Sequence, residues 1–168
     1  MKNRLNYQYY VEGEDERKLI NTLKTDFQVV VPGKVDVFNV TTKIITNARL
    51  IAIKPKTTVI LVFDTDVGDD KILRQNIAIF KECKSVIDIV TIPQCFNLED
   101  ELVNSCKIKT VTELFGSQGF RKFKSDFIKA SNLPLKLKEK EFDVSKLWSR
   151  DGMGKFKGIE NQSSKIKV

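Results

Sequence analysis

The sequence predicts a three-layer α/β/α protein, Rossmann-like, with a mainly parallel four-stranded sheet and a basic helical extension at its C-terminal end. Apolar runs of strand length alternate with segments of helical spacing through the first 93 residues. Such alternation predicts βαβ units and a parallel sheet, and continuous apolar strands are typical of a sheet buried on both faces. A chain of 168 residues is long enough for one ordinary domain with its own core.

Four short apolar runs are the predicted strands, and Pro32-Gly33 and Pro93 end the second and the fourth. The helical pattern is clearest where Leu19, Ile20 and Leu23 recur. The predicted strands are residues 7–12, 27–31, 58–64 and 86–92, and the predicted helices between them are residues 14–26, 36–52 and 69–83.

After residue 93 the pattern becomes helical. Asn97 is a good N-cap for a helix that starts at Leu98. A basic helix is expected over residues 119–131, with Pro134 as an interruption. Phe142 and Trp148 are expected to dock this part onto the core. The polar residues 149–168 contain three glycines, and we expect them to be loosely packed or disordered without a partner.

The excess of positive charge lies entirely in the C-terminal part. Residues 1–106, the expected α/β core, carry 14 basic and 15 acidic side chains, whereas residues 107–168, the expected extension, carry 15 basic and 7 acidic ones. A basic region of this kind indicates a polyanion as partner, usually DNA or RNA. The alternative is a solvated lysine-rich surface.

Composition excludes several kinds of chemistry and location. The chain has no histidine, so histidine bases, Ser-His-Asp triads and histidine metal ligands are excluded. Its three cysteines lack CxxC spacing, which supports neither a disulfide framework nor a zinc site and fits a reducing compartment. Residues 1–4 show no signal-peptide pattern, and no apolar run is long enough to span a membrane. We therefore expect a cytoplasmic protein with no membrane contact.

Acidic residues follow the first, third and fourth predicted strands. Glu12 ends the first, Asp64 and Asp66 end the third, and Glu99 follows the fourth. Ligands of open parallel sheets bind outside the carboxyl ends of the strands, and carboxylates suit Mg²⁺ or Mn²⁺. Two like charges about 4 Å apart repel by about 4 kcal/mol at an effective dielectric of 20, so converging carboxylates indicate a bound cation. Acidic side chains in the first turn of a helix, however, also interact favourably with the helix dipole, and this interaction alone can account for them.

These residues resemble the Toprim domain of topoisomerases and DnaG-type primases. The resemblance covers residues 7–93 and is anchored by Glu12-Gly13 and by Asp64-Thr65-Asp66. The run from Glu12 to Glu16 looks closest to the nuclease branch, the overcoming-lysogenization-defect (OLD) type, and Leu98-Glu99 is similar to a further pair in that branch.

The resemblance implies a nuclease that hydrolyses phosphodiester bonds of DNA or RNA with one or two Mg²⁺ or Mn²⁺ ions. It implies that Glu12, Asp64 and Asp66 bind the metal and take part in catalysis, and that Glu16 and Glu99 are secondary metal ligands. A family lysine would correspond to Lys155 or Lys157, of which we assign Lys155 a catalytic role. The expected nucleic-acid-binding residues are Arg121, Lys122, Lys124 and Lys129. The family's ATPase region is missing, so such regulation would need a separate ATPase or other partner protein. A stand-alone enzyme of this size would be similar to phage-defence or toxin effectors.

Two other functions fit the sequence. One is a non-catalytic nucleic-acid-binding module with a Toprim-like core. The other is a phosphatase or phosphotransfer domain that uses Asp64, because Asp64-Thr65-Asp66 also resembles the Asp-x-Asp of haloacid-dehalogenase-like phosphatases. In those phosphatases, however, the motif ends the first strand rather than the third. A response-regulator receiver is a third comparison, but it would need a fifth strand with a lysine.

Overall fold

The computed structural model describes residues 5–66 and 68–168. The prediction that residues 1–4 carry no signal-peptide pattern therefore lies outside the described residues. Its centre is a sheet of four strands, all parallel, in the order β2-β1-β3-β4. The strands are β1 (Asn6–Val11), β2 (Lys34–Val37), β3 (Thr57–Asp64) and β4 (Val86–Gln94). The predicted α/β fold with a parallel four-stranded sheet is therefore confirmed.

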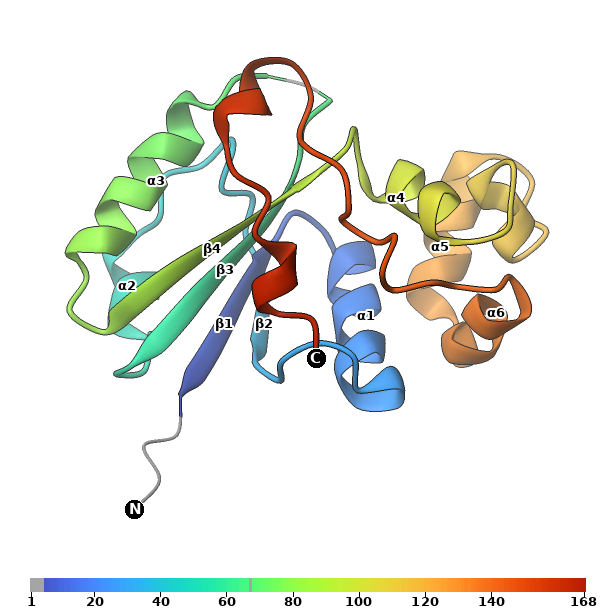
Figure 1. Ribbon diagram of the computed structural model, residues 1–168, viewed down its shortest axis with the longest axis horizontal. Helices are drawn as coiled ribbons and strands as arrows, with labels where there is room; N and C mark the ends of the chain where they lie inside the picture. The colour runs from blue at the N-terminus through green and yellow to red at the C-terminus, as the bar shows by residue number, and fades with distance from the viewer. Residues whose placement is uncertain (1–4, 67) are drawn as a thin grey trace.

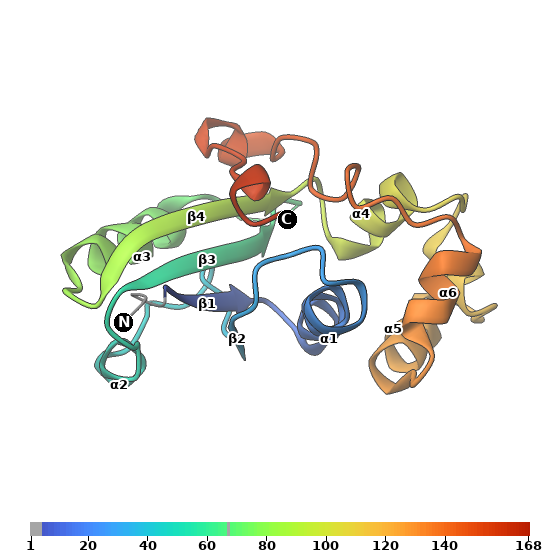
Figure 2. The same ribbon diagram turned by 60° about the horizontal axis from the view of Figure 1, so that its bottom comes forward.

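Helices cover both faces of the sheet, as Figures 1 and 2 show. Helix α1 lies on one side and α3 on the other, and α4, α5 and α6 form a group beyond α1. The helices are α1 (Glu14–Thr22), α2 (Asn47–Ile51), α3 (Lys71–Glu82), α4 (Leu98–Ser105), α5 (Phe120–Lys129) and α6 (Leu133–Glu139).

The strands bury side chains on both faces because successive residues point to opposite sides. In β3, Ile60 and Val62 join the core under α1, whereas Leu61 and Phe63 join the core under α3. The first core also contains residues of α5, α6 and Trp148. The C-terminal extension thus shares a hydrophobic core with the sheet.

The order of the strands brings the ends of β1, β3 and β4 together. Tyr10 of β1 pairs with Leu61 of β3, and Asp64, the last residue of β3, pairs with Gln94 of β4. Because the strands are parallel, their carboxyl ends form one edge of the sheet. We call it the carboxyl edge.

The prediction of a strand at residues 27–31 is wrong. Helix α1 continues into a π-helical turn, Leu23–Phe27, and the second strand of the sheet comes later, at Lys34–Val37. The β-branched residues that suggested a strand do make backbone bonds, but with the C-terminal segment. The amide of Val31 donates to the carbonyl of Ile166 at 2.8 Å, and that of Val168 donates to the carbonyl of Val29 at 3.1 Å.

The prediction of a helix over residues 36–52 is also wrong. Its first residues belong to β2, and only Asn47–Ile51 is helical, with Thr46 as N-cap. The buried apolar residues Val40 and Ile45 lie in a loop. Asn76 holds that loop, because its amide bonds the backbone of Val40, Lys43 and Ile45 at 2.8 Å each. A buried amide thus replaces helical hydrogen bonds.

The predictions for the later helices are mostly confirmed. Asn97 caps α4 by accepting a hydrogen bond from the amide of Asp100 at 3.0 Å, and α3 and α5 form where helices were expected. Pro134, in contrast, does not interrupt a helix. It lies in the first turn of α6, where proline's missing N–H costs nothing.

The prediction of a loose tail at residues 149–168 is wrong. Phe156 is buried against Phe63, with ring centroids 5.8 Å apart, and Ile166 is buried on the opposite face of the sheet. Between them, the backbone of Thr91 in the edge strand β4 bonds both the side chain and the backbone of Gln162. The segment, red in Figures 1 and 2, covers the edge that β4 would otherwise expose.

Within residues 5–66 and 68–168, no helix combines the length and the apolar character needed to cross a membrane.

The packing of the C-terminal segment can be tested by Phe156→Ala. Removing a buried phenylalanine costs about 3–5 kcal/mol, so we expect the free energy of unfolding in denaturant to fall by that order. Phe120→Ala is the matched control, because Phe120 is 63% exposed, and it should cost less than about 0.5 kcal/mol. Equal stability of both variants would mean that the segment does not pack on the sheet in solution.

Candidate metal centre at the carboxyl edge of the sheet

The structure gathers the predicted acidic residues at the carboxyl edge. Together with Asp15, the five predicted ligands form what we call the acidic cluster: Glu12, Asp15, Glu16, Asp64, Asp66 and Glu99. Glu12 follows β1, Asp64 and Asp66 end or follow β3, and the others lie in the first turns of α1 and α4. Strands far apart in the sequence thus deliver their carboxylates to one place.

Glu12 and Asp64 are in direct contact. The backbone amide of Asp64 donates a hydrogen bond to Oε1 of Glu12 at 3.2 Å, and Thr41 Oγ1 contacts the same oxygen at 3.3 Å. Both acids are only partly exposed. The loop after β1 and the end of β3 are therefore joined through the Glu12 carboxylate.

Glu16 is the most unusual member of the acidic cluster. It is 4% exposed, and its Oε2 atom is buried without a hydrogen-bond partner. A buried polar atom without a partner costs free energy. Gly13 provides the space for this carboxylate, because a Cβ at position 13 would lie 2.6 Å from Oδ1 of Asp15 and 3.1 Å from Oε2 of Glu16. The backbone at Gly13 is extended, so glycine is needed there for close packing rather than for the sharp turn that the sequence suggested.

The carboxylates raise one another's pKa. Burial is the main cause that raises the pKa of Glu16 to about 9, and the neighbouring acids Asp15 and Asp64 add to the shift. Burial and the charge of Glu12 raise the pKa of Asp64 to about 8, against a hydrogen bond from Gln94 that lowers it. Burial also raises the pKa of Glu12. Without a cation, part of the acidic cluster is therefore protonated near neutral pH.

Lys124 is the cation that the fold itself brings to this place. Its Nζ lies 3.3 Å from Oε1 of Glu99 and 3.7 Å from Oδ2 of Asp15. Lys124 belongs to α5, which packs against α1. A residue expected only to hold nucleic acid thus contacts the acidic cluster directly.

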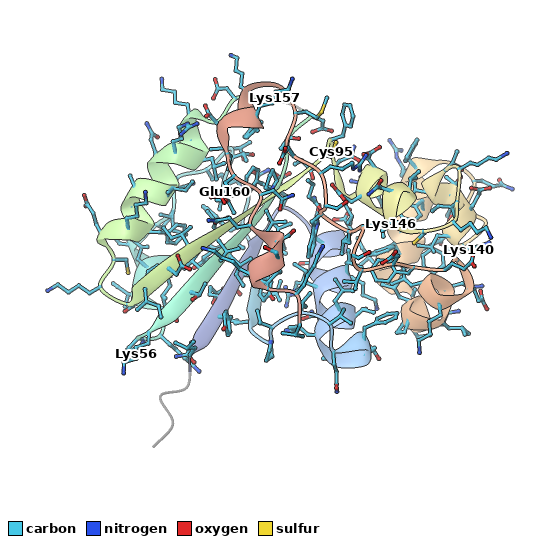
Figure 3. All side chains as sticks on the ribbon, viewed as in Figure 1. Lys56, Cys95, Lys140, Lys146, Lys157 and Glu160 are labelled. Carbon is cyan, nitrogen blue, oxygen red and sulfur yellow. The ribbon has the colours of Figure 1, made fainter. Side chains whose placement is uncertain are left out.

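The other basic residues lie apart from these contacts. Arg121, Lys122 and Lys129 are exposed on α5, and Lys122 pairs with Asp126 at 3.1 Å. Lys155 is exposed on the C-terminal segment, close to Lys157, which Figure 3 labels. That segment does reach the carboxyl edge, because the backbone amide of Met153 donates a hydrogen bond to Oγ1 of Thr65 at 2.9 Å.

Sequence reasoning missed Gln94. This residue is fully buried at the end of β4, and its Nε2 donates to Oδ1 of Asp64 at 2.7 Å and lies 3.5 Å from Oε1 of Glu16. A glutamine after an apolar run carries no signal of its own. Only the pairing of β3 with β4 places it opposite Asp64.

Two properties of the acidic cluster suit a metal ion: the chemistry of its ligand atoms, and an oxygen that lacks a hydrogen-bond partner. All donors are carboxylate oxygens, which Mg²⁺ and Mn²⁺ prefer, and Oε2 of Glu16 is left without a partner. In the described ranges, however, no group of three or more acidic or cysteine side chains is arranged so that it could hold a metal ion. The residues are thus of the right kind and gathered together, but they do not form a finished cage.

The raised pKa values predict how stability depends on pH. Glu16 and Asp64 ionise near pH 4 in the unfolded chain but only near pH 9 and 8 in the fold. The metal-free protein should therefore lose stability as the pH rises from about 5 to about 8, by at most about 1.4 kcal/mol per pH unit and group. The chain has no histidine to obscure this window.

Denaturant unfolding in EDTA at several pH values measures this slope. Glu16→Gln, which carries no charge at any pH, should flatten it, whereas the exposed control Glu139→Gln should not. A wild-type stability that stays constant over the window would contradict the raised pKa values.

Comparisons of the chain with protein-family models, with curated proteins and with solved structures find no match.

Proposed function

We propose that this protein is a divalent-metal-dependent nuclease that hydrolyses phosphodiester bonds of DNA or RNA at the acidic cluster. The observation that carries the proposal is the buried carboxylate of Glu16, which has an oxygen without a partner among other acids at the carboxyl edge. Such an arrangement destabilises the fold unless a cation offsets it. Perturbed carboxylates in this setting are typical of functional sites.

The residues that would hold Mg²⁺ or Mn²⁺ are the acids that end β1 and β3. Glu12, Asp64 and Asp66 would be the main ligands, with Glu16 and Glu99 as further ones. Asp66 is oriented by Asn97, whose Nδ2 donates to its Oδ2 at 3.3 Å. Because the carboxylates are not arranged as a cage, we expect their side chains to rotate on binding.

The reaction would be an attack of water on phosphorus. A bond forms between the water oxygen and phosphorus, and a carboxylate of the cluster takes the water proton. The bond between phosphorus and the sugar oxygen breaks, and that oxygen takes up a proton from solvent. The metal, when bound, would acidify the water and neutralise charge on the phosphate. As an alternative to its role as a ligand, Glu12 is a candidate for the base, because it is only partly exposed and its pKa is raised, mainly by burial.

Lys124 supports this chemistry better than Lys155. It contacts Glu99 and Asp15, so its ammonium group lies where a phosphate would meet the acidic cluster. A cation there would offset charge that develops on the phosphate oxygens. Arg121, Lys122 and Lys129, exposed on the same helix, would attract the nucleic-acid backbone without reading its sequence.

The two alternatives have less support. A phosphotransfer enzyme of the haloacid-dehalogenase kind would carry its Asp-x-Asp motif at the end of the first strand, whereas Asp64 ends β3. A non-catalytic module would have no use for a buried acidic cluster, although the basic helix α5 fits such a module as well. The three cysteines are free, in accord with a reducing, cytoplasmic location as part of the proposal.

Asp64→Ala tests the proposal directly. Loss of a central ligand should reduce Mg²⁺- or Mn²⁺-dependent cleavage of plasmid, single-stranded DNA or RNA by at least about 100-fold, while the protein still folds. Asp88→Ala is the matched control, because Asp88 is exposed near the opposite end of the sheet, and it should cleave like wild type. Cleavage by Asp64→Ala at the wild-type rate would refute the assigned site, and nucleic-acid binding without cleavage by any variant would favour the module.

Lys124→Met and Lys155→Met separate the two candidate lysines. We expect Lys124→Met to lower kcat by roughly 10- to 100-fold, since removal of a preorganised hydrogen-bond donor raises the activation free energy by up to about 4 kcal/mol. Lys155→Met should have a smaller effect, and Lys129→Met, on the same helix as Lys124, should mainly weaken binding. Cleavage assays at saturating metal measure kcat and KM separately, and the reverse ranking would assign the role to Lys155.

A further inference from the structure

A buried glutamine and the single tryptophan of the chain lie directly behind Asp64. Gln94 is 0% exposed and Trp148 is 1% exposed. The side-chain amide of Gln94 bonds both neighbours: its Nε2 donates to Oδ1 of Asp64 at 2.7 Å, and its Oε1 accepts from Nε1 of Trp148 at 3.2 Å. These two bonds connect the acidic cluster to the C-terminal extension.

The indole decides which way the Gln94 amide points. The Nε1–H group of tryptophan can only donate, so the oxygen of Gln94 must face Trp148. The NH₂ group of Gln94 then faces Asp64 and Glu16. Ionised carboxylates can only accept hydrogen bonds, so a donor such as this NH₂ group is their favourable partner. With the amide reversed, Gln94 would present its oxygen to two acids and its NH₂ to an N–H.

The position of Trp148 is itself fixed on several sides. Its backbone amide donates to Oε2 of the buried Glu101 at 3.0 Å, and its carbonyl accepts from Asn161 and Ser163 at 2.8 Å each. Its φ of +53° lies in the left-handed region, which a bulky residue adopts only when its surroundings hold it there. The extension thus holds the indole in one place.

We propose that Gln94 and Trp148 are positioning residues for the metal site, with Trp148 fixing the amide of Gln94 and Gln94 fixing the carboxylate of Asp64. The inference rests on the proposed function, because it assigns Asp64 as a metal ligand. Hydrogen bonds that orient metal ligands typically contribute 10- to 100-fold to metal affinity. The extension would then be needed to shape the site as well as to bind nucleic acid.

Calorimetric titration of the full chain with Mn²⁺ tests the affinity. We expect Gln94→Leu, which removes the amide, and Trp148→Phe, which keeps an aromatic ring but removes the donor, each to weaken Mn²⁺ binding by roughly 10- to 100-fold. Gln8→Leu is the matched control. Gln8 is a buried glutamine of β1 whose side-chain amide donates to the carbonyl of Tyr9 and to Asp36 instead, so its loss should lower stability and leave Mn²⁺ affinity unchanged.

Fluorescence gives a second measurement, which needs no variant. Because Trp148 is the only tryptophan, the tryptophan emission of the protein reports on its surroundings alone. Titration with Mg²⁺, which does not quench fluorescence, should change this emission with the same midpoint that calorimetry gives for Mg²⁺. Asp64→Asn should abolish both signals.

The outcomes separate the two proposals. A wild-type protein that binds neither Mn²⁺ nor Mg²⁺ would overturn the proposed function, and this inference with it. Metal binding by wild type, with equal affinity in Gln94→Leu and Trp148→Phe, would overturn the inference alone. So would Mg²⁺ binding that leaves the emission of Trp148 unchanged, even if neither variant folds.

Discussion

The constraint on which the site depends is the burial of like charges at one edge of a parallel sheet. Glu12, Glu16 and Asp64 are brought together by the pairing of β1 with β3 and by the first turn of α1. Burial and mutual repulsion raise the pKa of all three acids. The fold accommodates these acids partly through bonds from the Asp64 amide and from Gln94. A divalent cation would relieve what remains of this cost, which is why we interpret the acidic cluster as functional.

The C-terminal part of the chain has more than one physical role. It supplies Trp148 and α5 to the core under α1, and it covers the edge strand β4 through Gln162. It also brings Lys124 against the acidic cluster. The positive charge of the extension is therefore not all available to an outside partner, because part of it pairs with the acidic cluster. Core and extension depend on each other for stability and, in our proposal, for catalysis.

The acidic cluster and the basic helix α5 together suit a phosphodiester substrate. Exposed Arg121, Lys122 and Lys129 can attract the polyanion, while acids repel it unless a metal is bound. Binding of metal and of nucleic acid would therefore reinforce each other at the carboxyl edge. In our proposal, the same electrostatics would make the metal-free protein a poor partner for nucleic acid at that edge.

The sequence by itself determined the parallel α/β fold, the strands β1, β3 and β4, the helices α1 and α3 to α5, and the gathering of Glu12 and Asp64, because strand length, helical spacing and strand ends are local signals. Only the tertiary structure decided that Val29–Val31 bonds the C-terminal segment and that residues 149–168 pack on the sheet. Those outcomes depend on partners far away in the sequence, 71 residues apart for Thr91 and Gln162 and further for Val31 and Ile166, and no local pattern encodes them. The same holds for Gln94, Trp148 and Lys124. Their side chains meet the acidic cluster only after the sheet and the extension have packed together.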